Sequence, residues 1–116
     1  MQVIINIINN SKDALIEKML TNDSRKLIFM SCKVKDNELT IRIYDNAGGI
    51  PANVRDKIYE PYFTTKHQSQ GTGLGLYMSN EIIQKHFNGK IENKTIEYIY
   101  EDQNYKGEEF LIKLPI

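Results

Sequence analysis

The segment QVIINIINNSKDAL (residues 2–15) has the residue spacing of a helix that is apolar on one side. Isoleucine and valine recur at intervals of three and four residues, as in a helix that packs on a core. On a helical wheel of about 100° per residue, Asn6, Asn10 and Asp13 fall together on one flank of the apolar stripe, and Asn9 lies on the outer side. Asparagine costs roughly 0.5–0.7 kcal/mol relative to alanine inside a helix. The polar flank therefore needs an explanation.

Composition limits the classes of protein to consider. A chain of 116 residues is one domain, long enough for a single core. Its formal net charge is zero, which gives no reason to expect a nucleic-acid partner. A single cysteine excludes an internal disulfide framework and fits a reducing compartment. No apolar run reaches the roughly 20 residues that span a bilayer, so we expect a cytoplasmic domain without direct membrane contact.

The rest of the chain shows both strand and helix patterns. We expect strands at about 27–35, 39–45, 90–94, 95–101 and 108–114, and helices at about 2–20, 52–58 and 75–88. This order predicts an α+β domain, with a mixed sheet and helices packed on one face as a two-layer α/β sandwich. The lysines and glutamates of the C-terminal hairpin are interpreted as a solvated face, and its tyrosines as cross-strand packing residues.

An acidic residue is predicted on the buried face of the second strand. In LTIRIYD (39–45), Asp45 has the same parity as Ile41 and Ile43, so all three side chains point to one face. Burying a carboxylate without partners costs several kcal/mol or shifts its pKa. Two explanations are open at this point: Asp45 is satisfied within the protein, by Asn10 or by backbone groups, or it meets a ligand.

Two glycine-rich segments flank the middle of the chain. DNAGGI (45–50) follows the second strand, and its glycines permit close backbone approach to a flat ligand. GTGLGL (71–76) directly precedes a helix, where backbone N–H groups can bind an anion such as phosphate. Neither the dinucleotide-binding pattern nor the P-loop pattern fits, because the preceding strand and the Gly-Lys-Ser/Thr sequence are missing.

Four motifs in order make the sequence recognisable: NIINNSKDA (6–14), DNAGGI (45–50), EPYFTTK (60–66) and GTGLGL (71–76). This set resembles the N, G1, F and G2 boxes of the ATP-binding catalytic domain of bacterial sensor histidine kinases. That domain has the Bergerat fold of the superfamily that includes DNA gyrase, the Hsp90 chaperones and the MutL proteins. In this family a strand, a helix and a dimerisation domain precede the N box. We therefore expect an N-terminally truncated domain with an exposed sheet edge, marginally stable or paired as a homodimer.

The resemblance also assigns roles to residues. Asn10 matches the ligand of Mg²⁺, Asp45 matches the acceptor of the adenine amino group, and Phe63 matches the anchor of the ATP lid. The implied nucleotide-binding residues are Asn6, Asn10, Asp13, Asp45, Gly49, Ile50, Phe63, Thr65, Lys66, Gly71, Thr72, Gly73, Leu74, Gly75 and Leu76. The G1 box departs mildly from the family, because Ala47 stands where many members have glycine.

One position bears on the reaction. Hydrolysing relatives carry a glutamate, as general base, four residues before the metal-binding asparagine, and here that position is Asn6. An amide cannot accept the proton, so we expect transfer to histidine, with gyrase- or MutL-type hydrolysis and a non-catalytic nucleotide-binding module as alternatives. Neither His67 nor His86 lies in an acceptor motif. We therefore expect the acceptor in the dimerisation domain, a response regulator as further partner, and a fragment that binds Mg-ATP without phosphorylating itself. Membrane anchoring of the parent protein is left open.

Overall fold

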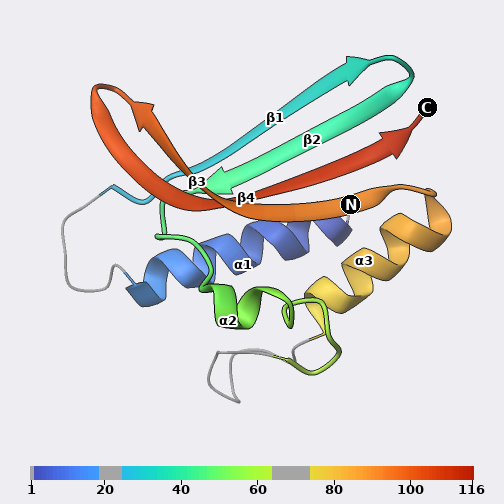
Figure 1. Cartoon of the computed structure of the whole chain (residues 1–116), viewed down its shortest axis with the longest axis horizontal. Helices are drawn as coiled ribbons and strands as arrows, with labels where there is room; N and C mark the ends of the chain where they lie inside the picture. Colours follow the sequence, from blue (N-terminus) through green and yellow to red (C-terminus); the bar gives the residue numbers. More distant parts are fainter. Residues whose placement is uncertain (1, 19–24, 64–73) are drawn as a thin grey trace.

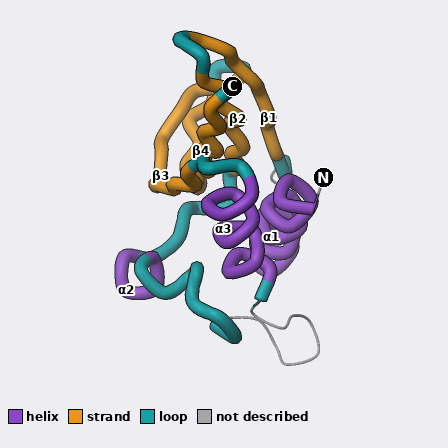
Figure 2. The backbone as a smooth tube through the Cα atoms, turned by 90° about the vertical axis from the view of Figure 1, so that its right-hand side faces the viewer, coloured by secondary structure: helices purple, strands orange, loops and turns teal. Residues whose placement is uncertain are grey.

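The computed structural model describes residues 2–18, 25–63 and 74–116, which form two layers (Figures 1 and 2). One layer is an antiparallel sheet, and the other contains the two long helices, which lie side by side on one face of the sheet. The elements are α1 (Gln2–Lys18), β1 (Ile28–Lys35), β2 (Glu38–Asp45), α2 (Ala52–Arg55), α3 (Gly75–His86), β3 (Lys90–Tyr100) and β4 (Gln103–Pro115). The predicted α+β class, with helices on one face, is confirmed.

The sheet differs from the expectation in two details. Its strand order is β1-β2-β4-β3 and every pairing is antiparallel, so within the described residues the sheet is not mixed. The expected strands 90–94 and 95–101 are one continuous strand, β3. The turn is confined to Glu101 and Asp102, both with positive φ, so most of the segment between the expected strands 95–101 and 108–114 belongs to β4. Because β4 pairs with β2, residues 106–108 lie next to the end of β2.

The apolar core lies between the helices and the sheet. It is formed by Val3, Ile7, Ile41, Ile43, Ile83, Phe110, Ile112 and Leu114. The helical wheel of α1 is confirmed, since Ile7 is fully buried whereas Asn9 is exposed. Helix α3 ends as predicted near Asn88, which has φ 53°, and the Gly89 N–H donates to the Ile83 carbonyl at 2.9 Å. A left-handed residue after the last turn is a common way to end a helix.

Aromatic side chains pack across the strands, as predicted. Tyr98 makes an edge contact with Tyr44 at 4.9 Å between ring centroids, and Phe29 stacks on Tyr44 at the same separation. On the neighbouring part of β4, Glu109 forms an ion pair with Arg42. Glu109 is buried, so our interpretation of the C-terminal hairpin as a solvated face is wrong at this residue. Arg42 on β2 and Lys94 on β3, which are distant in the sequence but flank β4 in the sheet, place their cationic groups beside its carboxylate.

Several large apolar side chains on β1 and α1 remain exposed. Met30 and Val34 on β1 are 54% and 64% exposed, and Ile5 and Ile16 on α1 are 50% and 47% exposed. In the described part of the chain, no helix combines the length and the apolar character that crossing a membrane requires.

Candidate nucleotide-binding site

Asp45 ends β2 and is buried, as the strand parity predicted. Its Oδ1 accepts hydrogen bonds from the backbone N–H groups of Ala47 at 3.0 Å and Glu108 at 3.2 Å. The Tyr98 hydroxyl donates to the Asp45 carbonyl at 2.7 Å. Backbone groups therefore satisfy one carboxylate oxygen, as one of our two explanations proposed. A carboxylate has about four acceptor positions, so this bonding is compatible with a ligand at Oδ2.

The close approach of β4 to Asp45 requires a glycine. A Cβ atom on Gly107 would lie 1.8 Å from the Asp45 carbonyl oxygen. No side chain fits at that distance, so Gly107 allows β4 to lie against the end of β2 and to present the Glu108 N–H to Asp45. Sequence reasoning missed this residue, because it falls between two expected strands, where a glycine is typical of a turn.

The loop after Asp45 takes a conformation that glycine favours. Gly48 and Gly49 have φ values of 95° and 90°, which lie in the left-handed region. The Gly48 N–H donates to the Lys106 carbonyl at 2.9 Å. A Cβ on Gly49 would lie 2.7 Å from Thr95 Cγ2. The loop is therefore packed against β3 and tied to β4, and its path leaves no room for a side chain at Gly49.

Asn46 fastens the same loop to the segment that leads into β1. Its Oδ1 accepts from the Leu27 N–H at 2.8 Å, and its Nδ2 donates to the Arg25 carbonyl at 2.7 Å. An amide that both donates to and accepts from backbone fixes the spacing of two chain segments. The start of β1 and the loop after β2 are therefore held together.

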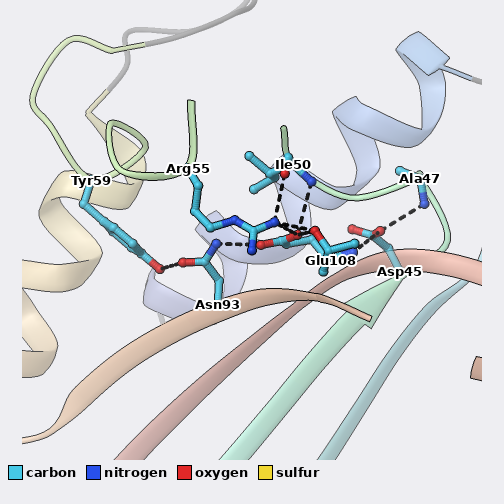
Figure 3. Close-up of polar contacts among 8 residues, drawn as sticks. Asp45, Ala47, Ile50, Arg55, Tyr59, Asn93 and Glu108 are labelled. Atoms are coloured by element: carbon cyan, nitrogen blue, oxygen red, sulfur yellow. Dashed lines mark hydrogen bonds and ion pairs between the residues drawn. The ribbon is translucent and has the colours of Figure 1, made fainter. Parts of the chain in front are cut away.

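A polar cluster that sequence reasoning missed lies beside the loop, with the buried Glu108 at its centre and half-buried residues around it (Figure 3). Its members are Arg55, Tyr59, Asn93, Thr95 and Glu108. Glu108 is 3% exposed, and our interpretation of it as solvated is wrong for the same reason as for Glu109. The signal was present in the sequence: Asn93 and Thr95 share the parity of the half-buried Ile91 on β3, but dividing β3 into two strands concealed it.

Glu108 is the acceptor at the centre of this cluster. Its Oε1 accepts from the Ile50 N–H at 3.1 Å and from Thr95 Oγ1 at 2.8 Å, and Arg55 Nη2 lies 3.2 Å away. Its Oε2 accepts from Asn93 Nδ2 at 2.6 Å. The carboxylate is thus both paired with a cation and hydrogen-bonded, which is the condition for a stable buried charge.

The cluster extends to the segment after α2. The Tyr59 hydroxyl donates to Asn93 Oδ1 at 2.8 Å. Burial and, to a smaller extent, the charge of Glu108 raise the pKa of Tyr59, so its hydroxyl stays a donor to higher pH than that of an ordinary tyrosine. Tyr59 and Ile58 also pack against the core. This segment is therefore fixed both by apolar packing and by hydrogen bonding.

The N-terminal part of the polar flank of α1 contacts the beginning of α3. Asn6 Nδ2 donates to the Gly75 carbonyl at 3.3 Å and to Ser79 Oγ at 3.1 Å. Asn10 and Asp13 follow on the same flank and are half-buried. Within the described residues, no group of three or more histidine, cysteine or acidic side chains could hold a metal ion. The amide oxygen of Asn10 is nevertheless a hard donor of the kind that suits Mg²⁺.

The remaining predicted residues divide into two groups. Leu74 precedes α3, while Gly75 and Leu76 begin it, and Leu76 packs against the core. Phe63 is half-buried. The positions Thr65, Lys66, Gly71, Thr72 and Gly73 lie outside the described residues, as does His67. His86 is exposed at the end of α3.

An antiparallel sheet with helices on one face, a buried acid at a strand end and a glycine loop packed beside it are the features of the ATP-binding class of domain that the sequence resembles. Comparison with known proteins shows the same class. Residues 1–116 match the family of histidine kinase-, DNA gyrase B-, and HSP90-like ATPases, and the chain belongs to this family.

Relatives of the chain include a two-component sensor and a sensor kinase. The chain is 37% identical over 84 residues to the two-component sensor PprA of Pseudomonas aeruginosa. The matched region covers 72% of this chain and 9% of the relative. The chain is 36% identical to the sensor kinase CckA of Brucella abortus, covering 98% of this chain and 12% of the relative. The chain thus spans about a tenth of the length of these relatives. The nucleotide-free catalytic domain of histidine kinase ThkA superposes with a TM-score of 0.71 at 28% identity, covering 98% of this chain and 65% of that one.

Proposed function

We propose that the domain binds Mg-ATP and that, within a longer protein, it donates the γ-phosphate to a histidine of a separate dimerisation domain. The observation that supports this most is the burial and hydrogen bonding of Asp45. The side chain is buried, and the two backbone N–H groups that donate to it both bind Oδ1. Its orientation is therefore fixed, and Oδ2 can accept a hydrogen bond from the amino group of adenine.

Neighbouring residues fit the same ligand. The backbone of the glycine loop can lie close to a flat base, and the half-buried Ile50 can form an apolar wall. The amide oxygen of Asn10 would hold Mg²⁺, and the bound ion would neutralise part of the phosphate charge. The backbone N–H groups at the beginning of α3 would face the phosphates.

The environment of Asn6 favours transfer to histidine over hydrolysis. Its nitrogen donates to Gly75 and Ser79, and its oxygen accepts from Gln2 Nε2 at 3.1 Å. A side chain in this state cannot remove a proton from water. An imidazole is neutral over much of the physiological pH range and needs less help from a base. A response regulator is the expected receiver of the phosphoryl group, in a cytoplasmic signalling pathway.

Titration calorimetry tests the nucleotide site. The parent domain should bind Mg-ATP, and Asp45→Asn should bind it roughly tenfold to hundredfold more weakly, as expected for losing a hydrogen bond to a charged group. The variant should fold, because an amide can place its oxygen at the Oδ1 position. Asp36→Asn, with the same charge change in the exposed β1–β2 turn, is the control. Absence of Mg-ATP binding by the parent would overturn the proposal and favour a module that does not bind the nucleotide.

A second experiment separates the reactions. Incubation with γ-labelled ATP should leave this domain unlabelled, while addition of a dimerisation domain that carries an acceptor histidine should give acid-labile label on that partner. Steady release of phosphate by the purified domain alone would instead support the hydrolysing alternative.

A further inference from the structure

We propose that Glu108 and Arg55 are positioning residues for the base of the nucleotide, and that their ion pair sets how strongly the domain prefers adenine. This inference depends on the proposed function, since it assigns base selection to the same site. It concerns residues to which neither the motifs nor their spacing gave a role.

Glu108 contacts both ends of the loop that follows β2. Its backbone N–H donates to Asp45 Oδ1, and its side-chain Oε1 accepts from the Ile50 N–H. One residue of β4 therefore fixes the acid that would accept from adenine and also the last residue of the loop beside it. The relative position of Asp45 and Ile50 is determined by the conformation of Glu108.

Arg55 completes the arrangement by binding the carbonyl of the same residue, Ile50. Its Nη2 donates to the Ile50 carbonyl at 2.8 Å and lies 3.2 Å from Glu108 Oε1. The N–H and the C=O of Ile50 are thus bound to the two partners of one ion pair (Figure 3). Such a double attachment fixes the position of the residue more strictly than either bond alone, which is how supporting residues preorganise a binding site.

Thr95 links the pair to the glycine of the loop. Its hydroxyl donates to Glu108 Oε1 and accepts from Arg55 Nη2, while its side chain occupies the space that a Cβ on Gly49 would need. The cluster therefore supports the loop at Gly49 and at Ile50. A shift of this loop by a few tenths of an ångström would alter the distance between Asp45 Oδ2 and the amino group of a bound base.

The matched control lies one residue away. Glu109 is as buried as Glu108, at 4% against 3% exposed, and it also forms an ion pair with an arginine, Arg42. Consecutive residues of a strand point to opposite faces, so Glu109 faces away from the loop. A variant at Glu109 removes a comparable buried charge without touching Asp45 or Ile50.

The experiment compares Mg-ATP with Mg-ITP, whose base has a carbonyl in place of the adenine amino group, by calorimetry on the whole domain. In the parent we expect a clear preference for ATP. Glu108→Gln should reduce the ratio of the two dissociation constants roughly tenfold, the effect of misaligning about one hydrogen bond, whereas Glu109→Gln should leave it unchanged. Glu108→Gln should fold, because glutamine has the same shape and Arg55 is partly exposed.

A second variant keeps the test valid if a single change disturbs folding. Arg55→Gln alone would leave Glu108 as an uncompensated buried charge, so we combine the two substitutions in the double variant Arg55→Gln/Glu108→Gln, which removes both charges. This double variant should show the same reduced ratio. A ratio equal to that of Glu109→Gln in either folded variant would overturn the positioning role and leave the proposed function intact. A parent that binds no Mg-ATP, or binds both nucleotides equally, would overturn the proposed adenine site itself and this inference with it.

Discussion

The side-chain nitrogen of Asn6 in α1 lies 3.1 Å from the hydroxyl of Ser79 in α3, and 3.3 Å from the carbonyl of Gly75. Ser79 is fully buried, and its hydroxyl also donates to the Gly75 carbonyl at 2.8 Å. Asn6 thus ties α1 to the first turn of α3, the helix that begins where the G2 box ends. This contact explains why a helix that packs on the core has an asparagine at this position.

Replacing Asn6 with alanine should destabilise the domain. The change removes the donor to the Ser79 hydroxyl and one of the donors to the Gly75 carbonyl, at an expected loss of about 1–2 kcal/mol in the free energy of unfolding. Urea denaturation followed by circular dichroism measures this. Asn9→Ala is the matched control, since Asn9 is exposed on the same helix and alanine is the better helix former. Equal stabilities of the two variants would contradict the role of Asn6.

Introducing the glutamate of the hydrolysing relatives should also weaken the fold. In Asn6→Glu a carboxylate would face the Gly75 carbonyl, and an ionised carboxylate has no proton to donate. We expect a loss of about 1–3 kcal/mol in the free energy of unfolding. Asn9→Glu adds the same charge at an exposed position of the helix and should be nearly neutral. If Asn6→Glu is as stable as this control, the contact between α1 and α3 does not depend on the amide.

Gly107→Ala should be among the most damaging single changes. The added methyl group would lie 1.8 Å from the Asp45 carbonyl oxygen, so β2 and β4 would have to separate. We expect a loss of about 3 kcal/mol or more, seen as a lower thermal midpoint. Gly48→Ala is the control: its φ is 95°, but no atom lies within 4 Å of the added Cβ. This variant should lose only about 1 kcal/mol through backbone strain.

Ionisation of Tyr98 should lower the folding stability of the domain at high pH. Burial, followed by the charge of Asp45, raises the pKa of Tyr98 from 10.0 to about 12. Between these values the unfolded chain loses the proton and the folded domain keeps it, so stability falls as pH rises from about 10 to 12. Urea midpoints across this range should decline less steeply in Tyr98→Phe than in the parent. Tyr62→Phe, at an exposed tyrosine, should keep the slope of the parent, and an unchanged slope in Tyr98→Phe would contradict the prediction.

The sequence determined those parts of the site that depend on local periodicity. The helical repeat of α1 separates Asn6 and Asn10 from the exposed Asn9, and the two-residue repeat of β2 directs Asp45 to the buried face. The paired glycines at 48 and 49 likewise indicated a loop after β2, and in the structure both have positive φ. These features follow from residues close together in the chain, so no knowledge of tertiary contacts was needed.

Only the tertiary structure decided the role of the C-terminal hairpin. Glu108 appeared to be a surface residue because nothing nearby in the sequence covers it. It is buried because the loop at Ile50 and the side chain of Arg55, which are 58 and 53 residues away in the sequence, fold against it. The burial and pairing of a charged residue depend on which distant segments pack upon its strand. The sequence therefore supplied the candidate nucleotide-binding residues, and the antiparallel pairing of β2 with β4 determines which residues hold Asp45 and its loop in place.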